Sequence, residues 1–168
     1  PSAAQVEGDV LGHVEIRPTD DVAMIGHFAP LVGPIQARAR SLTVIERVAE
    51  PTGLLRPEAE GPATLARCQV ALVTATSIIG HQVDRLLEAA RNCRHVVLLG
   101  ASTPLLPEAF TGTSATLLSG VVVADAEAVL RVVSEGGGTW EFKPYVRKVA
   151  VAVRPPGAAH PSPDGSAG

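Results

Sequence analysis

Three short apolar stretches, each ending in small, polar or ionisable residues, limit most strongly how this chain can fold. They cover residues 22–25, 70–73 and 96–99, and each is followed by a stretch that can be helical. Apolar runs of this length that alternate with helical patterns predict parallel strands joined by crossover helices. The fold class that we predict is therefore α/β, Rossmann-like, with three α/β/α layers and a mostly parallel sheet of about five or six strands.

The composition fits a single folded domain. The chain has 168 residues, enough for one domain of ordinary size with a substantial core. Hydrophobic residues make up 46% and charged residues 18%, which excludes a disordered chain and fits strands that are buried on both faces. No apolar run approaches the roughly 18 residues of a membrane span, so we expect a soluble protein without a membrane partner.

Charge and aromatic content argue against nucleic acid as a partner. The net charge is −3 and aromatic residues make up 3% of the chain, so we expect neither a basic surface nor stacking platforms. The two cysteines, Cys68 and Cys93, form no CxxC motif, and no signal-peptide pattern is seen. We therefore expect neither a disulfide framework nor a zinc ribbon, and we predict a reducing, cytoplasmic location.

The local patterns predict the order of elements along the chain. Strands are expected at residues 22–25, 42–45, 70–73 and 95–99, at either 116–118 or 121–123, and at the sheet edge over 140–142 and 145–153. Helices are expected at residues 4–11, from Pro34 onward, and at 65–68, 83–91, 107–110 and 125–135. The apolar side chains of the helix at 83–91 form one stripe, which consists of Val83, Leu86, Leu87 and Ala90.

Polar and ionisable residues follow the predicted parallel strands at the point where each strand ends. They are His27, Glu46, Thr74, Thr76, Ser102 and Thr103, with His81 just beyond. Ligands of open parallel sheets bind outside the carboxyl ends of the strands, so these residues can converge on one crevice. Imidazole and carboxylate are suitable ligands for zinc, nickel, iron or copper, which makes His27, Glu46 and His81 the candidate metal ligands. Hydroxyls or backbone amides can hold an organic or anionic part of a ligand.

Each candidate also has an interpretation without a ligand. His27 can be a turn histidine that is hydrogen-bonded to the backbone, Glu46 a solvated strand end, and His81 an exposed residue near a helix start. Ser102 and Thr103 can cap a helix that holds the following proline in its first turn. Capping and anion binding are compatible at such a helix start, so the sequence leaves these alternatives open.

Several of these segments carry a family resemblance. They are the turn Gly26-His27-Phe28, the strand that ends in Glu46, and the stretches at 73–79, 96–105 and 118–121. Together they resemble the Rossmann-like domain of the putative heavy-metal chelation family over residues 8–142, and the Gly-x-Ser-Thr-Pro-Leu stretch is the most specific part. The chain departs from the family pattern at residues 79–82, where Ile-Gly-His-Gln stands in place of Ile-Asn-Gly-Thr.

The resemblance implies a Rossmann-like fold preceded by a domain similar to the N-terminal part of enolase, with a site in the cleft between them. Residues 1–19 would then be a remnant of that first domain, and residues 20–153 the Rossmann-like domain. Residues 154–168 are mostly Pro, Gly, Ala and Ser and are expected to form a disordered tail. As partners besides the ligand we expect either a second copy of the chain in a homo-oligomer or the missing N-terminal domain.

The strand-end residues and the resemblance together predict the binding of a transition metal, or of a metal-bearing small molecule, at the carboxyl edge of the sheet. The metal ligands would be drawn from His27, Glu46 and His81. The residues expected to contact the ligand are Gly26, His27, Phe28, Glu46, Thr74, Thr76, Gly100, Ser102 and Thr103.

Two other classes of function stay open. Glu46 stands 20 residues after Gly26, about where an acidic residue meets the ribose in dinucleotide or S-adenosylmethionine sites. However, the turn has one glycine where GxGxxG needs three, and His27 and Phe28 add bulk, so no ordinary NAD site is expected. The other class is a non-catalytic module completed by a missing domain or partner, which an exposed apolar surface beside the crevice would indicate. The chain has no GxSxG, HExxH or Walker motif, so we assign no catalytic residue and leave enzymatic activity open.

Overall fold

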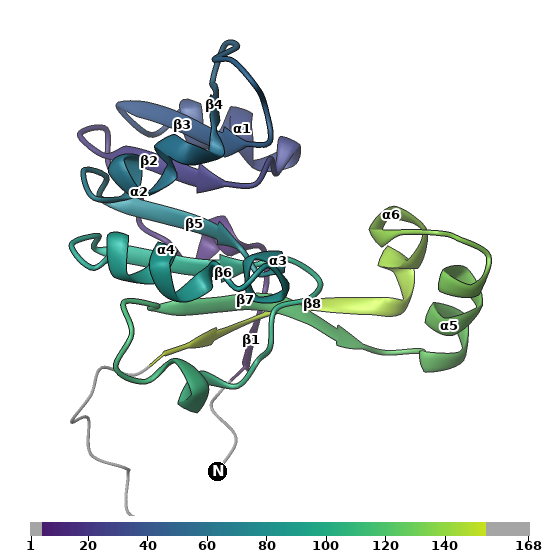
Figure 1. Cartoon of the computed structure of the whole chain (residues 1–168). Helices are drawn as coiled ribbons and strands as arrows, with labels where there is room; N and C mark the ends of the chain where they lie inside the picture. Colours follow the sequence, from purple (N-terminus) through teal and green to yellow (C-terminus); the bar gives the residue numbers. More distant parts are fainter. Residues whose placement is uncertain (1–4, 154–168) are drawn as a thin grey trace, which may run out of the picture.

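The computed structural model of the protein describes residues 5–153 of the chain. These residues form an eight-stranded sheet with the strand order β1-β8-β7-β6-β5-β2-β3-β4 (Figure 1). The strands are β1 (Gln5–Glu7), β2 (Asp21–Ile25), β3 (Ser41–Glu46), β4 (Leu55–Pro57), β5 (Val70–Thr74), β6 (His95–Leu99), β7 (Leu117–Val123) and β8 (Val146–Ala152).

The helices are short and alternate with the strands along most of the chain. The α-helices are α1 (Ala29–Gln36), α2 (Gly61–Leu65), α3 (Thr76–Ile79), α4 (Val83–Ala89), α5 (Ala126–Ser134) and α6 (Thr139–Phe142). The 3₁₀ helices are η1 (Val10–Gly12), η2 (Glu58–Glu60), η3 (Pro107–Phe110) and η4 (Lys143–Tyr145). Within residues 5–153, no helix has the length and apolar character that crossing a membrane requires.

The neighbouring strands β4-β3-β2-β5-β6-β7 all run parallel, whereas β8 and β1 pair antiparallel at one side of the sheet. Counted along the chain, the parallel strands have the doubly wound order 3-2-1-4-5-6 of Rossmann folds. This order reverses between β2 and β5. The predicted α/β class is confirmed, although the sheet is larger than the expected size of about five or six strands.

The strand β2 is buried on both faces of the sheet, and its side chains alternate between two core clusters. Ala23 and Ile25 belong to the cluster that includes residues of α2 and α4. Val22 and Met24 belong to the cluster that includes residues of α1 and of the segment around η1. In Figure 1, α2 and α4 accordingly cover one face of the sheet, while α1 lies on the other. The continuous apolar run at 22–25 is thus explained by helices on both faces.

The amphipathic pattern of α4 is confirmed. Val83, Leu86, Leu87 and Ala90 all pack in the core cluster that this helix shares with α2. The intervening charged residues of the helix are exposed. The helix ends after Ala89, close to the predicted end at residue 91.

Several predicted elements were wrong in position or type. The expected helix at 4–11 contains β1, and residues 140–142, expected as an edge strand, lie in α6. Glu141 fixes the start of α6 because its carboxylate accepts a hydrogen bond of 2.9 Å from the amide of Gly138. The helix α1 begins at Ala29 rather than at Pro34, because a proline at the second position already favours a helix start there.

Two other differences concern neighbouring segments. The helix expected at 65–68 lies earlier, as α2, and the short strand β4, which was not predicted, lies in the Pro- and Gly-rich segment that precedes it. The alternatives for the fifth strand, at 116–118 or at 121–123, belong largely to the single strand β7. The tail predicted at 154–168 lies outside the described residues.

The strands β7 and β8 extend beyond the rest of the sheet and carry α5 and α6 at their far end (Figure 1). Asp125 caps α5 because its carboxylate accepts a hydrogen bond of 2.9 Å from the amide of Ala128. None of the residues of α5 is fully buried, and the side chains of Leu130, Val133 and Trp140 are exposed. This two-helix extension therefore contributes little to the core.

The two cysteines lie in contact near the amino-terminal edge of the sheet. Both are free, and their Sγ atoms are 3.3 Å apart. Each thiol also donates to the carbonyl oxygen of Leu65 at 3.4 Å. Cys68 follows α2 and Cys93 follows α4, so the pair links the ends of two helices that cover the same face.

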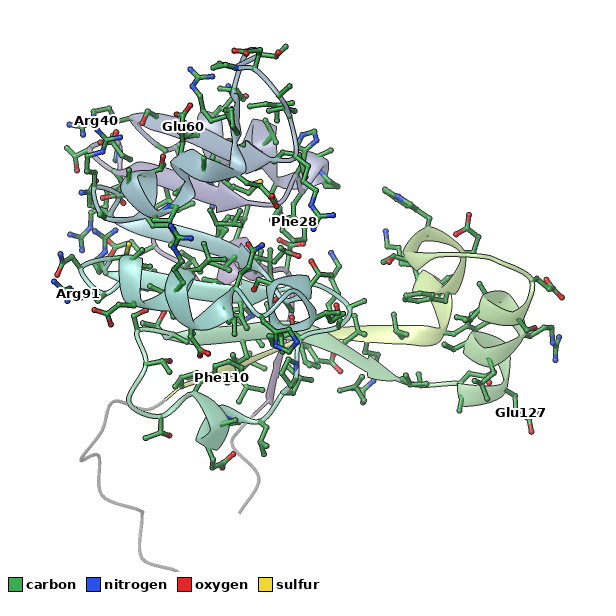
Figure 2. The ribbon with its side chains drawn as sticks, in the orientation of Figure 1. Phe28, Arg40, Glu60, Arg91, Phe110 and Glu127 are labelled. Atoms are coloured by element: carbon green, nitrogen blue, oxygen red, sulfur yellow. The ribbon has the colours of Figure 1, made fainter. Side chains whose placement is uncertain are left out.

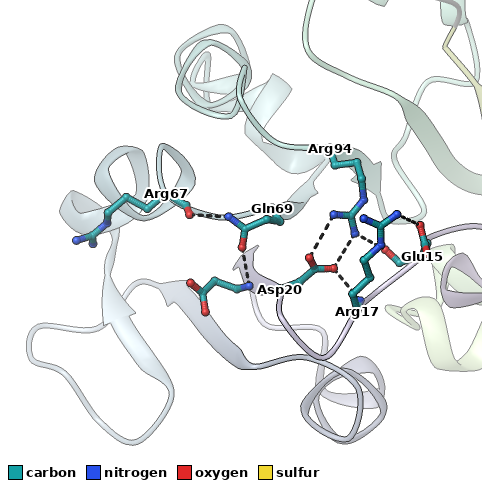
Figure 3. Close-up of polar contacts among 7 residues, drawn as sticks. Glu15, Arg17, Asp20, Arg67, Gln69 and Arg94 are labelled. Carbon is teal, nitrogen blue, oxygen red and sulfur yellow. Dashed lines mark hydrogen bonds and ion pairs between the residues drawn. The ribbon is translucent and has the colours of Figure 1, made fainter.

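A buried ion pair anchors the amino-terminal ends of the central strands (Figure 3). The carboxylate of Asp20, only 2% exposed, accepts hydrogen bonds from the guanidinium of Arg94 at 2.7 and 3.2 Å. It also accepts a bond of 2.7 Å from the amide of Arg17, and Arg94 donates to the carbonyl of Glu15 at 3.1 Å. The side-chain bond from Arg94, as the largest cause, and the backbone bond from Arg17 lower the pKa of Asp20. The pair thus joins the segment before β2 to the start of β6.

We predict that Arg94→Leu lowers the free energy of unfolding by about 2–4 kcal/mol, because it leaves the buried carboxylate of Asp20 without its cation. Arg91→Leu is the matched control, since the side chain of Arg91 pairs with Glu88 in an exposed position one helical turn away. Its cost should stay below about 0.5 kcal/mol. Urea unfolding of both variants measures the difference, and equal losses would contradict the anchoring role.

A second carboxylate at this edge makes stability depend on acid pH. Hydrogen bonds from Arg40 and Ser41 lower the pKa of Asp21 to about 2 from its ordinary value of 3.8. A depressed carboxyl pKa adds stability above the unfolded value, and this stability is lost as the pH falls through the folded value. We therefore predict that wild-type protein and Asp21→Asn differ most in unfolding free energy above pH 4 and converge near pH 2. Urea unfolding across this range tests the prediction, and a difference independent of pH would contradict it.

Candidate functional site

A pocket of about 460 Å³ lies at the carboxyl ends of β2, β3 and β5, where the strand order reverses. Figure 2 shows Phe28 at this edge of the sheet and Arg40 and Arg91 at the opposite edge. The pocket is lined by Ile25, Gly26, His27, Phe28, Ile45, Glu46, Arg47, Glu58, Thr74, Thr76, Ser77, Gly80, Gln82 and Leu86. Its volume lies within the range of small-molecule sites, and the reversal point is where ligands of doubly wound sheets bind.

The turn after β2 needs glycine at position 26. Gly26 has a φ of +87°, which is in the left-handed region, and its amide donates to the carbonyl of Ile45 at 2.9 Å. A Cβ atom at this position would lie 3.1 Å from the Cβ and 3.2 Å from the Cγ2 of Thr74. The chain can therefore turn closely past the end of β5 only without a side chain at this residue.

The carboxylate of Glu46 is hydrogen-bonded to the backbone of His27, so these two candidate metal ligands are neighbours. Its carboxylate accepts a hydrogen bond of 3.0 Å from the backbone amide of His27 and one of 2.8 Å from that of Arg47. Each oxygen accepts one of these bonds, so lone pairs remain on both for a ligand. The side chain of His27 is exposed and lines the same pocket. The structure thus places a carboxylate and an imidazole-bearing residue at adjacent strand ends.

The side of the pocket near β4 contains the guanidinium of Arg47 and a second carboxylate, that of Glu58. Arg47 donates to Glu58 at 3.3 Å, and both side chains are largely exposed. Exposed pairs of this kind contribute little stability. With Glu46 and Glu58 against Arg47, carboxylates outnumber the guanidinium in the lining, which favours a cationic ligand.

Three hydroxyl groups lie at the end of β5. The Oγ1 atoms of Thr74 and Thr76 are hydrogen-bonded at 2.9 Å. The neighbouring Ser77 is only 7% exposed, and its Oγ has no hydrogen-bond partner within the described residues. Both threonines were predicted site residues, whereas Ser77 was not, although the serine follows Thr76 directly.

Glu58 and Gln82 were also missed, for a different reason. Glu58 reaches the pocket because β4 pairs with β3 so that Pro57 lies opposite Glu46. A three-residue strand inside a Pro- and Gly-rich loop gives no pattern that could reveal this pairing. Gln82 precedes α4, one residue after His81, and its place in the lining depends on how α3 and α4 are joined.

Four predicted site residues lie outside the pocket lining. Gly100, Ser102 and Thr103 follow β6, on the far side of β5 from β2. The amide and hydroxyl of Thr103 both donate to the carbonyl of Gly100, at 3.1 and 2.8 Å, so this residue closes a turn instead of capping a helix. The helical turn that follows begins only at Pro107. A ligand-binding role for these three residues stays a prediction.

His81 is the fourth predicted site residue that lies outside the pocket lining. It is exposed, has a φ of 53°, and precedes α4 without lining the pocket. In the part of the chain that the structure describes, no group of three or more His, Cys, Asp or Glu side chains could hold a metal ion. The predicted set of His27, Glu46 and His81 is therefore not assembled as one centre, and only His27 and Glu46 share the pocket.

The sheet order and the pocket at its reversal point define a Rossmann-like domain. The model of the family described as "Putative heavy-metal chelation", DUF364, matches residues 9–152, and the chain belongs to this family. No curated protein matches the chain.

Solved structures of the same family support the fold. A DUF364 protein of unknown function from Pyrococcus horikoshii is 22% identical, with a TM-score of 0.81 over 89% of this chain and 60% of that one. A DUF364 protein of unknown function from Desulfitobacterium hafniense is 27% identical, with a TM-score of 0.71 over 79% of this chain and 52% of that one. The match therefore spans less than two thirds of the length of either relative.

We predict that Gly26→Ala lowers the free energy of unfolding by about 1–3 kcal/mol, because it places a side chain at positive φ against Thr74. Gly12→Ala is the matched control, since a Cβ there would meet nothing within 4 Å and Gly12 lies outside the left-handed region. It should leave the free energy of unfolding unchanged or raise it by up to about 1 kcal/mol. Urea unfolding measures both, and equal effects in the two variants would contradict the turn constraint.

Proposed function

We propose that the protein binds a divalent transition metal ion, free or carried by a small molecule, in the pocket at the carboxyl edge of the sheet. The observation that carries the proposal is the contact between Glu46 and the amide of His27. It holds one oxygen-donor and one nitrogen-donor residue at neighbouring strand ends. Carboxylate and imidazole together suit zinc, nickel, iron and copper.

The donor set also limits how the metal is held. Two protein ligands leave at least two positions of a tetrahedral ion open, and within the described residues no third His, Cys, Asp or Glu joins them. Water or a small chelating molecule would supply the remaining donors. A pocket of about 460 Å³ has room for such a molecule beside the ion.

The charge of the lining and the family description support the same ligand. Glu58 lies near Glu46, and only Arg47 offsets these two carboxylates. The family to which the chain belongs is described by heavy-metal chelation. Both support a cation as the bound species, and the pocket has an oxygen donor and a nitrogen donor suited to it.

Calorimetric titration of the metal-stripped protein with Ni²⁺, Zn²⁺, Cu²⁺ and Fe²⁺ tests the proposal. We expect one site for at least one of these ions, with the Kd raised about tenfold or more in His27→Ala and in Glu46→Gln, because each removes a ligand. His81→Ala is the matched control, since His81 lies outside the lining, and its Kd should equal that of the wild type. Thermal unfolding checks that all variants are folded.

Two results would reject the metal site. One is the absence of binding for every ion, whether it is added alone or with citrate. The other is binding that His27→Ala and Glu46→Gln leave unchanged, which would place the ion elsewhere on the chain.

A nucleotide ligand is the second candidate, and the strand order is the observation that favours it. Gly26 follows the first parallel strand and Glu46 ends the second, as in dinucleotide-binding sheets. The same titration with adenosine nucleotides and S-adenosylmethionine separates the two candidates. Nucleotide binding that is lost in Glu46→Gln, together with no metal binding, would favour the nucleotide.

A module completed by a further domain or partner is the third candidate. Ile79 is 73% exposed and stands between Ser77 and Gly80, which both line the pocket. A contiguous apolar surface beside the crevice is the sign expected for such a cover, and Ile79 supplies one exposed residue of it. Titration of a longer chain, if it binds ligand where the 168-residue chain does not, would favour this candidate.

A further inference from the structure

The two cysteines of the chain form a dithiol pair that the proposed ligand site does not use. Cys68 and Cys93 are both free, and their Sγ atoms lie 3.3 Å apart. The sulfur atoms of a disulfide are about 2.05 Å apart, so bond formation requires them to approach by only about 1 Å. The pair is therefore close to the distance of a disulfide.

The backbone also holds the two cysteines close together. The residues that follow them, Gln69 and Arg94, are hydrogen-bonded, because the amide of Arg94 donates to the carbonyl of Gln69 at 2.8 Å. Directly beyond this bond, β5 and β6 begin as parallel neighbours, with Val70 opposite His95. Both cysteine side chains pack in the core cluster that includes residues of α2 and α4, so they point to the same face of the sheet. The sulfurs thus stay adjacent without any rearrangement of the strands.

The two thiols differ in their access to solvent and in their acidity. Cys68 is only 5% exposed, whereas Cys93 is partly exposed and lies in the turn after α4. The hydrogen bond between the sulfurs lowers the pKa of Cys93, while the same bond, together with burial, raises the pKa of Cys68. The thiolate is the reactive form of cysteine, so Cys93 is the group with which an external reagent reacts first.

We propose that Cys68 and Cys93 form a reversible intramolecular disulfide by exchange with a low-molecular-weight disulfide such as glutathione disulfide. The thiolate of Cys93 attacks one sulfur of this reagent, which forms a mixed disulfide and releases one glutathione thiolate. The released thiolate takes the proton of Cys68, whose sulfur then attacks the sulfur of Cys93 and releases the second glutathione. The two protein thiols lose two electrons and two protons in total, and the reagent is reduced to two glutathione thiols.

The disulfide joins the ends of two helices that already pack together. Cys68 follows α2 and Cys93 follows α4, and both helices cover the same face of the sheet (Figure 1). The covalent link restrains the unfolded chain and leaves the native contacts in place, so the oxidised protein is the more stable form. This inference does not depend on the proposed metal site, because neither cysteine lines the pocket.

Incubation of the folded protein with glutathione disulfide, followed by intact-mass measurement and thiol counting, tests the proposal. We expect wild-type protein to lose both thiols and the mass of two hydrogen atoms, and to retain no glutathione. Excess dithiothreitol should restore both thiols. The Tm of the oxidised protein should exceed that of the reduced protein by about 5–10 °C.

Two single variants separate the roles of the thiols. Cys68→Ala keeps the attacking thiol without its partner, so it should retain one bound glutathione. Cys93→Ala keeps only the buried thiol, which should react with glutathione disulfide at least about tenfold more slowly. Equal rates in the two variants would contradict the assignment of Cys93 as the attacking thiol. Thermal unfolding checks that both variants are folded, and the wild-type comparison decides the proposal even if one of them is not.

Three results with wild-type protein would overturn the inference. One is that the folded protein keeps both thiols under conditions that oxidise the urea-unfolded protein. Another is that it retains one or two glutathione molecules, because Cys68 would then fail to displace the first. The third is a disulfide that links two chains or that lowers the Tm, since the native fold would then not accommodate the intramolecular bond.

Discussion

The position of the candidate site depends on β2, which pairs in parallel with β3 on one side and with β5 on the other. Ile25, the last residue of this strand, lies opposite both Ile45 and Val73. The residues that come next, Gly26, Glu46 and Thr74, therefore stand level at the carboxyl edge. A shift of one residue in either pairing would turn alternate side chains to the opposite face, and core packing on both faces of β2 opposes such a shift.

The two edges of the sheet use their polar groups differently. At the amino-terminal edge, Asp20 is paired with Arg94 and Asp21 with Arg40, although the Nε of Arg94 has no partner within the described residues. At the carboxyl edge, Glu46 holds the loop amides of His27 and Arg47 but keeps further lone pairs. The ion pairs serve stability, whereas the spare lone pairs of Glu46 are available to a ligand.

Elements with a clear local pattern of apolar residues could be predicted from the sequence. Elements that depend on pairing with distant segments were missed. The strands β2, β5 and β6 are continuous apolar runs, and α4 has a regular apolar stripe, so both kinds of element are visible locally. By contrast, β1 and β4 are three residues long and exist through pairing with β8 and β3. No local pattern of three residues distinguishes such a strand from a loop.

The same distinction explains how much of the site was predictable. The rule that ligands bind beyond the carboxyl ends of parallel strands identified His27, Glu46 and Thr74, which do line the pocket. The same rule also pointed to Ser102, because it identifies the edge of the sheet where ligands bind but not which strands along that edge form the site. The strand order supplies that position, since it reverses between β2 and β5 and leaves β6 on the far side of β5.

The distance between the two edges lets their effects be studied separately. β2 has five residues, so it spans about 17 Å at about 3.3 Å for each residue. Substitutions separated by more than about 10 Å, with no shared contacts, normally have additive effects. A change in ligand affinity in variants of His27 or Glu46 can therefore be attributed to the pocket itself, because the ion pair of Asp20 and Arg94 holds the opposite edge of the sheet.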